Sequence, residues 1–508
     1  MEHNTFSTRT VTFDIKTESI DMKTTSSEST KIPDYQGTVK KILSTSPKPV
    51  ITDVRLGDNE LTIYGDVQVT VVYETEDNTF DSINLSAPFQ CTAEGDYPEG
   101  IYQHLYQASV DEIDVKPLKN RKIETECLVS IAGFSVASIS CDTIDTDYAQ
   151  TDLQYRYEEV GHTVMKTASI EKEVRDSLYV GDDGSEIEVL SVNCYIADTD
   201  KNLSSVGILY NATIKGSVFC KLTDEEENFV YKSFPVEVPF NCFVERDDLA
   251  SIDYYSINGD IIATAAQPDN EMEESYINLA LTVCTNATMF QLSSASVLSD
   301  CYSFTQSARQ LTNTISAFNI SSYDTKTIHL NKEIILPEAA KFVCFQDVLL
   351  SCQEERYDNK VSLLGNADVL MSLMSYNTEE SFYALREALD FSADIPLEAD
   401  EDCYIDTQLS KIDIKQNSAE IALSIDVELT VFKYEPVSIT LVQDVALEEY
   451  EADATDSFDI IVHYMQPNEE LWDIAKKYLV PAEKILQDNN FDSEGDLQEY
   501  APILIMRS

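Results

Sequence analysis

The sequence predicts a mainly β protein: three consecutive antiparallel, β-sandwich-like repeats followed by a small βααβ module. Three observations lead to this prediction. Apolar and polar residues alternate in segments such as 61–73, 123–134 and 419–432, which is the period of a strand with one buried face. A motif of six residues occurs twice, at a constant spacing of 151 positions. Helical periodicity is confined to the segment after residue 458.

The length and the net charge of the chain limit the number of domains and the kinds of partner that are expected. A chain of 508 residues exceeds the usual size of one domain, and about three to five folded units are expected. Asp and Glu number 91 against 35 Lys and Arg, a net charge of −56, which argues against nucleic acid and anionic membrane surfaces as partners. Because 43% of the residues are apolar, the acidity is not that of a disordered chain.

Three motifs that the sequence lacks bear on the location of the protein and on the redox state of its cysteines. The N-terminal residues contain no apolar run of the length that a signal peptide requires, and no later stretch approaches the ~20 apolar residues of a transmembrane helix. We therefore expect a cytosolic protein. The 11 cysteines form no C-x-x-C pair, which favours reduced, buried thiols in strands over the alternative of zinc or redox chemistry.

The recurring motif defines the repeats. Its matched residues are Thr62, Gly65, Val67, Pro88, Phe89 and Cys91 in the first copy and Thr213, Gly216, Val218, Pro239, Phe240 and Cys242 in the second. A looser third copy contains Gly365 and Phe391, and an alternating strand begins downstream of each copy, near Ile123, Ile277 and Ile421. The predicted units are an N-terminal arm and three repeats, at residues 1–29, 30–140, 166–300 and 330–437.

The shared glycine and the shared Pro-Phe pair have structural explanations. A glycine inside a strand indicates a bulge or a close approach of neighbouring atoms. A phosphate-binding loop is the alternative, but it needs several glycines in a fixed pattern that this sequence does not contain. The Pro-Phe pair is expected at the start of an edge strand, with the Phe in the core.

After the third repeat the composition changes. Residues 447–457 form an acidic linker that is expected to repel itself, and residues 458–508 form the terminal module. Within the module, residues 458–464 read as a strand and residues 469–478 as a helix with apolar residues at helical spacing. Pro481 is expected to begin a second helix, and residues 503–506 to close the module as a strand.

The terminal module resembles a LysM domain. The residues that carry the resemblance are Gln466-Pro467, Leu471 to Tyr478, Val480, Glu483, Ile485-Leu486, Asn489-Asn490 and Leu504-Ile505. LysM domains bind N-acetylglucosamine-containing glycans through two loops, which correspond here to residues 466–470 and 489–492. The resemblance, together with the first-helix face, predicts a site for a partner or glycan made of Asn468, Glu469, Glu470, Trp472, Asp473, Lys476, Asn489 and Asn490.

One departure from the LysM pattern changes the expected ligand. The usual Gly-Asp-Thr of the first loop is replaced by Asn468-Glu469-Glu470, and carboxylates facing a neutral sugar lose hydration without gaining a partner. We therefore expect this face to bind a protein, and we expect the module to stay folded when both glutamates are changed to lysine. Trp472, the only tryptophan, is expected to pack in the small core, with ligand stacking as the alternative.

The repeats resemble the SPOCS repeat of SipL-type and SpoVID-like spore-coat morphogenetic proteins. The resemblance rests on Ile32-Pro33-Asp34 followed by Val39, Ile42 and Leu43, then Val72-Tyr73 and Pro88-Phe89, and on the order of several repeats ahead of a terminal LysM. Members of that family work in the mother cell of an endospore-forming bacterium. The resemblance implies a position at the forespore surface and, as partners, a coat basement-layer morphogenetic ATPase and other coat proteins.

No catalytic, metal or cofactor site is predicted. The five histidines are far apart in the sequence, and no H-E-x-x-H or G-x-S-x-G motif occurs. Residues 181–184 favour a solvated turn over a weak calcium loop. We expect a non-enzymatic scaffold of spore coat assembly. The alternatives are a cell-envelope LysM protein that binds peptidoglycan- or chitin-type glycan and a cell-wall enzyme with a LysM targeting module.

Overall fold

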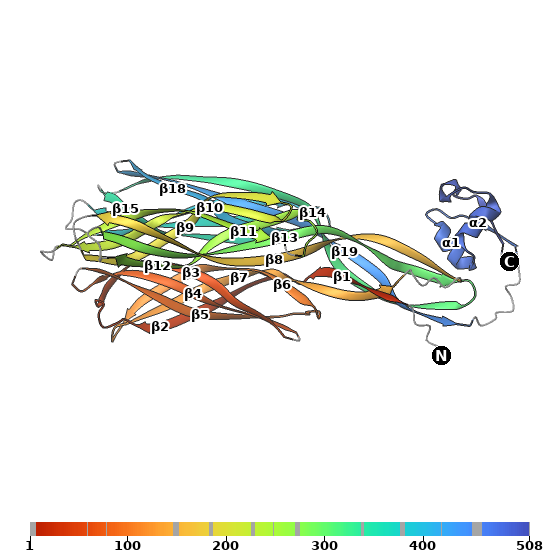
Figure 1. Ribbon diagram of the computed structural model, residues 1–508, viewed down its shortest axis with the longest axis horizontal. Coiled ribbons are helices and arrows are strands. Elements are labelled where there is room, and N and C mark those ends of the chain that lie inside the picture. Colours follow the sequence, from red (N-terminus) through yellow and green to blue (C-terminus); the bar gives the residue numbers. More distant parts are fainter. Residues whose placement is uncertain are drawn as a thin grey trace.

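The protein is elongated and consists mainly of long antiparallel strands, with one small helical region at the C-terminal end (Figure 1). The computed structural model describes residues 7–57, 59–77, 79–145, 152–181, 186–224, 229–246, 248–269, 275–336, 340–375, 382–417, 419–449 and 460–506. Every strand pairing within these ranges is antiparallel. The predicted mainly β, antiparallel class is confirmed.

The first unit, residues 8–144, contains two sheets that face each other. Its strands are β1 (Thr8–Lys16), β2 (Ile20–Lys31), β3 (Val39–Leu56), β4 (Glu60–Thr75), β5 (Phe80–Glu94), β6 (Ile101–Leu118) and β7 (Lys122–Ile144). One sheet has β7 paired with β1, β2 and β6, and the other has the order β3-β4-β5.

The N-terminal segment departs from the prediction. Residues 1–29 were expected to form an arm, but β1 and most of β2 lie in this range and pair with β7. Val11, Phe13 and Ile15 alternate with polar residues and mark a strand with one buried face. The strand that pairs with β1 is more than 100 positions away, so the local sequence does not show the pairing.

Two further units have a comparable arrangement. The second unit, residues 153–303, comprises β8 (Leu153–Gly181), β9 (Glu186–Ser204), β10 (Gly207–Thr223), β11 (Phe229–Glu245), β12 (Tyr254–Asp269) and β13 (Ser275–Ser303). The third unit, residues 307–448, comprises β14 (Ser307–Ile335), β15 (Ala340–Tyr357), β16 (Lys360–Ser375), β17 (Phe382–Pro396), β18 (Asp402–Asn417) and β19 (Glu420–Glu448). In both, the first, fifth and sixth strands form one sheet and the other three strands form the second sheet.

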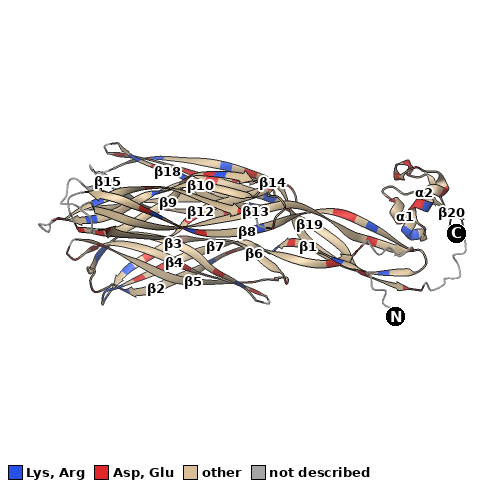
Figure 2. Ribbon diagram, in the orientation of Figure 1, with Lys and Arg blue, Asp and Glu red and all other residues tan. Residues whose placement is uncertain are grey.

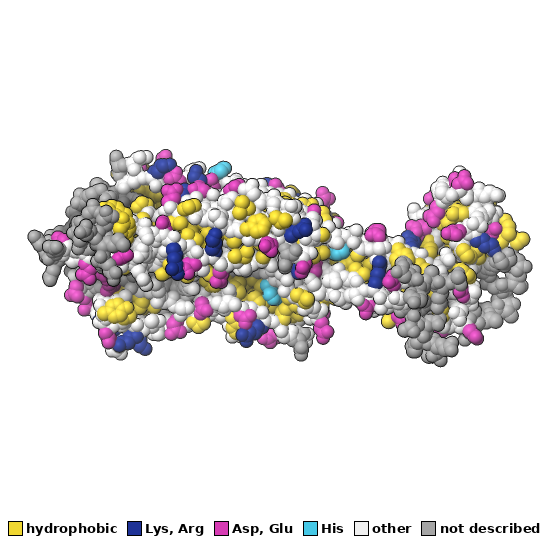
Figure 3. All heavy atoms as spheres, viewed as in Figure 1, with side chains coloured by type: hydrophobic (Ala, Val, Ile, Leu, Met, Phe, Trp, Pro, Cys, Tyr) yellow, Lys and Arg dark blue, Asp and Glu magenta, His cyan; other side chains and the backbone are white. Residues whose placement is uncertain are grey.

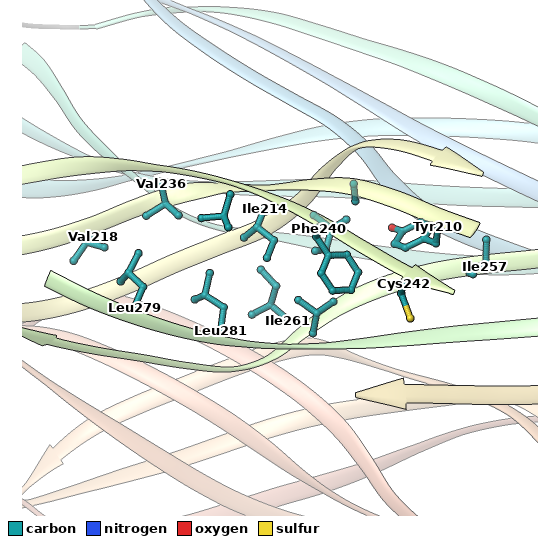
Figure 4. Close-up of a cluster of buried hydrophobic side chains, with 14 of the residues drawn as sticks. Tyr210, Ile214, Val218, Val236, Phe240, Cys242, Ile257, Ile261, Leu279 and Leu281 are labelled. Atoms are coloured by element: carbon teal, nitrogen blue, oxygen red, sulfur yellow. The ribbon is translucent and has the colours of Figure 1, made fainter. Parts of the chain in front are cut away.

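Each unit has an apolar core between its two sheets. In the second unit, alternate residues of β10, β11 and β13 point inward, as Figure 4 shows for Val218, Val236 and Leu281. The rings of Tyr210 and Phe240 meet edge to face, with centroids 6.3 Å apart. This burial of alternating residues is the main stabilising contribution that the two-residue period predicts.

The shared glycines lie in the central strands β4, β10 and β16, but their surroundings differ. A Cβ on Gly65 would lie 2.2 Å from the ring of Phe89, and one on Gly365 would lie 2.0 Å from the ring of Phe391. Gly216 pairs with Val236, whereas Phe240 pairs with Ala212. The β10–β11 register is therefore displaced by an even number of residues, which keeps the same side chains facing inward.

The Pro-Phe pairs lie on edge strands but not at their starts. Pro88 is in the middle of β5, and Pro239 is in the middle of β11. Both strands are at the edge of a three-stranded sheet, where a missing N–H does not interrupt the ladder. Phe89 and Phe240 are buried, as expected.

The three units pack against one another through the long strands. The outer parts of these strands extend beyond the paired sheets toward the C-terminal helices, where the molecule narrows (Figures 1 and 3). A buried cluster combines Phe134 of β7, Phe290 of β13 and Phe432 of β19, one aromatic residue from each unit. Further along, two more clusters again contain residues of all three units.

Buried polar groups also cross between units. Asp14 of β1 accepts a hydrogen bond from the backbone N–H of Met165 in β8, at 2.7 Å. Asp406 of β18 accepts hydrogen bonds from Gln107 of the first unit, at 3.0 Å, and from Ser256 of the second unit. Burial raises the pKa of Asp406.

The C-terminal module comprises β20 (Ile460–Tyr464), α1 (Leu471–Tyr478), α2 (Ala482–Asn489), the 3-10 helix η1 (Glu494–Asp496) and β21 (Pro502–Met506). β20 pairs with β21, and both helices contribute to one small core. The residues of the predicted linker up to Glu448 belong to β19, and 450–457 lie outside the described residues.

Acidic residues are spread over the sheets and the module (Figure 2). The structure describes the side chains of ten of the 11 cysteines, and these ten are free. None of the helices in these residues has the length and apolar character needed to span a membrane.

Candidate functional site

The first loop of the module is held by a buried histidine. Glu469 accepts a hydrogen bond from the backbone N–H of Gln466 at 2.8 Å and contacts Nε2 of His463 at 2.7 Å. The other ring nitrogen, Nδ1, lies 3.0 Å from the Tyr478 hydroxyl. The Glu469 side chain is only 16% exposed. Glu469 therefore connects β20, the loop and α1.

This environment affects both charge and stability. Burial raises the pKa of the Glu469 carboxyl, but the hydrogen bond from Gln466 and the contact with His463 outweigh burial, so its pKa lies below the ordinary value. The expectation that Glu469 can be changed to lysine without loss of folding assumed a surface side chain, and the buried position of Glu469 contradicts that assumption, so we now expect this change to destabilise the module. A lysine would place its charge beside His463 and leave the Gln466 N–H without an acceptor.

Glu470 directly precedes α1 and contacts both the first turn of the helix and the second unit. It is the N-cap residue, and its side chain and that of Asp473 form a capping box. One carboxylate oxygen lies 2.8 Å from Nη1 of Arg156, on β8 of the second unit. The Glu470 side chain is 57% exposed, so this ion pair is open to solvent.

Trp472 and Lys476 lie one turn apart on α1 and meet the same carboxylate. The indole N–H of Trp472 donates to Oδ2 of Asp300 at 2.8 Å, and the Lys476 ammonium lies 2.7 and 2.8 Å from the two Asp300 oxygens. Gln310 of β14 donates to Oδ1 at 2.6 Å. Burial raises the pKa of Asp300, but these hydrogen bonds outweigh burial and the pKa is lowered.

Tyr302 of β13 enters the core of the module. It is 3% exposed, and it packs in the same cluster as Leu471, Ile474 and Ile485. Its hydroxyl donates to the backbone carbonyl of Val480 at 2.9 Å. Its ring meets that of Trp472 edge to face, with centroids 5.0 Å apart. Trp472 thus packs on the small core, as expected, and also contacts the second unit.

The three asparagines of the predicted site have different surroundings. Asn489 is occupied within the module: its amide donates to Ile485 O at 2.8 Å and Leu504 O at 2.6 Å, and its oxygen accepts from Leu504 N at 2.7 Å. Asn468 and Asn490 are exposed and have positive φ of 61° and 54°. Asn490 ends α2 in the left-handed conformation that asparagine tolerates.

The eight predicted residues therefore separate into groups. Glu470, Trp472 and Lys476 face the second unit, whereas Glu469 and Asn489 support the module from within. The residues that sequence reasoning missed are Arg156, Asp300, Tyr302, Gln310 and His463. The first four lie far from the module in sequence, and no local pattern connects them to it. His463 alone carried a signal, as a polar residue on the inward side of a short strand.

The structure brings together no set of metal ligands in its described part: no three His, Cys, Asp or Glu side chains are arranged to hold an ion there. The histidines 104, 162, 329 and 463 belong to four separate places in the fold. Asp182 and Asp183 of the weak calcium motif lie outside the described residues.

Comparison with known families addresses the first unit. Residues 38–117 match the family model described as SipL, SPOCS domain. The match begins just before β3 and ends within β6, so it covers four consecutive strands of the first unit. This match supports a relationship between the chain and SipL-like proteins. Neither a search of curated proteins nor a search of solved structures gave a match.

Proposed function

We propose that this chain is a non-enzymatic scaffold of spore coat assembly that acts at the forespore surface in the mother cell. The observation that carries the proposal is the SPOCS match at residues 38–117. It lies in the first of three units that each combine a three-stranded sheet with a second sheet, which has four strands in the first unit and three in the others. A SPOCS match associates the chain with sporulation. Long sheets that pack against one another through shared clusters are suited to holding other proteins at fixed positions.

The second and third units are, in this proposal, further SPOCS repeats. Strands β9 to β12 and β15 to β18 occupy the places that β3 to β6 occupy in the matched unit. Ile123, Ile277 and Ile421 each lie within three residues of the start of the last strand of their unit and are fully buried. The proposed repeats then extend over residues 8–144, 153–303 and 307–448, beyond the boundaries expected from the motif.

The terminal unit is proposed to be a LysM module that binds a protein. Its support is the order β20, α1, α2, β21 and the burial of Leu471, Ile474 and Ile485 at positions of the LysM pattern. The partners that the resemblance implies are a coat basement-layer ATPase and other coat proteins. Because the chain carries a net charge of −56, basic patches on these partners would speed association.

The alternative is a cell-envelope protein that binds peptidoglycan- or chitin-type glycan. The two loops of a LysM domain would have to present polar groups to the sugar. The side chains of Glu469 and Asn489 are instead engaged in hydrogen bonds within the module. Titration of the full chain with an N-acetylglucosamine hexamer, followed by Trp472 fluorescence, tests this alternative. We expect no saturable change, and a micromolar Kd would favour the glycan function.

Localisation in sporulating cells tests the scaffold proposal. A fluorescent fusion of the full chain should gather around the forespore, and a fusion of residues 1–448 serves as the control for the contribution of the module. A diffuse signal of the full-length fusion throughout sporulation, or a source cell that forms no spores, would contradict the proposal.

A further inference from the structure

One end of the paired strands β8 and β13 carries charges that match those of α1. Arg156 and Asp300 are directly opposite each other in the antiparallel ladder, so their side chains lie on the same face. Arg156 pairs with Glu470 at the start of α1, and Asp300 pairs with Lys476 in its last turn. A basic residue of β8 and an acidic residue of β13 thus meet an acidic and a basic residue of the helix.

Apolar contact reinforces this match. Tyr302 is two residues beyond Asp300 on the same strand, and alternate residues share a face. Its ring is buried against Trp472 and the core of the module, and its hydroxyl satisfies the carbonyl of Val480. This end of the β8–β13 pair therefore offers a carboxylate, a guanidinium and an aromatic ring, each with a partner on the module.

Asp300, the residue that contacts both Trp472 and Lys476, is also held by the third unit. Asp300 also accepts a hydrogen bond from Gln310 of β14, which orients the carboxylate independently of the module. The module follows β19 through residues 449–459. A segment of that length can span about 36 Å when extended, so the module could separate from β8 and β13 and stay attached. Tethering keeps its local concentration high and favours return to the same place.

We infer that this contact is a latch: the end of the β8–β13 pair packs against Trp472 and holds Glu470 and Lys476 in ion pairs, and a partner that binds this face must displace it. The contact is a feature of the fold. The assignment of this face as the one that binds a partner rests on the proposed function. A partner then gains access only by displacing Asp300 and Tyr302, so the latch limits recruitment until a competing surface is present.

Trp472 is a direct reporter of the latch because the chain contains no other tryptophan. The test uses the full chain with Asp300→Ala or Arg156→Gln. Arg175→Gln is the matched control, since Arg175 is also on β8 but pairs with Glu173 away from the module. Acrylamide quenching of Trp472 measures opening, and amide hydrogen exchange of β20 and β21 shows whether the module stays folded.

A latch predicts at least a twofold increase in the Trp472 quenching constant in Asp300→Ala and a smaller increase in Arg156→Gln, with β20 and β21 still protected. Arg175→Gln should match the wild type. Unchanged quenching in Asp300→Ala would overturn the inference. Loss of β20 and β21 protection together with exposure of Trp472 would also overturn it, because this end of β13 would then be a permanent part of the module's core.

The biological consequence is measured separately, with fluorescent fusions in sporulating cells. If the latch limits access, the fraction of Asp300→Ala fusion at the forespore should exceed that of the wild type. A lower fraction would contradict this role of the latch. A diffuse signal for the wild type would contradict the proposed function, whereas the quenching result would still decide whether the latch exists.

Discussion

Gly65 and Gly365 show how the absence of one side chain sets the packing of a whole sheet. Each lies opposite a phenylalanine of the neighbouring strand, and the aromatic ring fills the space that a Cβ would take. At Gly65 the backbone of Val50 also approaches, and β3 has a register shift beside this pair. The glycine thus permits both close approach of a ring and a local bulge.

Replacing Gly65 by alanine should therefore destabilise the protein. The new methyl group would meet the Phe89 ring at 2.2 Å and Val50 O at 2.5 Å, and overpacking of this kind costs about 1–3 kcal/mol. Gly161→Ala in β8 is the control, because nothing lies within 4 Å of a Cβ there. It should be neutral or stabilise the protein by up to about 1 kcal/mol. Urea unfolding measures both, and equal midpoints would contradict this explanation.

At the scale of elements, the turn from β20 into α1 depends on one carboxylate. Glu469 joins the buried ring of His463 to the backbone of the turn, and Glu470 then caps the helix. Two adjacent glutamates thus have different tasks. The first supports the module from within, and the second faces Arg156 of another unit.

Glu469→Gln should weaken the module more than Glu470→Gln. The first change removes a charged acceptor from a mostly buried pair of contacts, which should cost about 1–3 kcal/mol of module stability. The second affects an exposed ion pair worth about 1 kcal/mol or less. Unfolding of the module is followed by Trp472 emission in urea. A larger loss in Glu470→Gln than in Glu469→Gln would show that the turn is not held as described.

At the scale of the whole molecule, the three units share cores that belong to none of them alone. In β19, residues from Ile421 to Val431 face the core of the third unit, whereas Phe432 and Tyr434 face the other units. β7 and β13 contribute Phe134 and Phe290 to the same cluster. This shared burial should make the units unfold together.

Phe432→Ala tests that cooperativity, with Phe240→Ala as its matched control. Both residues are buried, and either truncation should cost about 3–5 kcal/mol. Phe240 packs in the core of the second unit alone, whereas Phe432 joins the three units. Calorimetry should show one transition at a lower Tm for Phe240→Ala and a broadened or divided transition for Phe432→Ala. A single sharp transition in both variants would refute the coupling.

The sequence by itself determined the secondary structure of most elements. Alternation around Gly65 and Ile123 predicts strands because every second side chain faces a core, and the spacing of Leu471, Ile474 and Ala475 predicts α1 because these residues line one helix face. These periods are local physical constraints, readable within one window of the chain. The face of α1 was located in the same way.

Only the tertiary structure decided what covers these faces. Alternation shows that Phe13 is buried but not that β7 pairs with its strand, and nothing near Trp472 indicates Asp300, which lies 172 positions away. The same holds for the cluster of Phe134, Phe290 and Phe432. A hydrophobic period shows which surface of an element must be removed from water. The segment that packs against this surface is selected by its match in shape and charge, and distant segments meet only once the chain has folded.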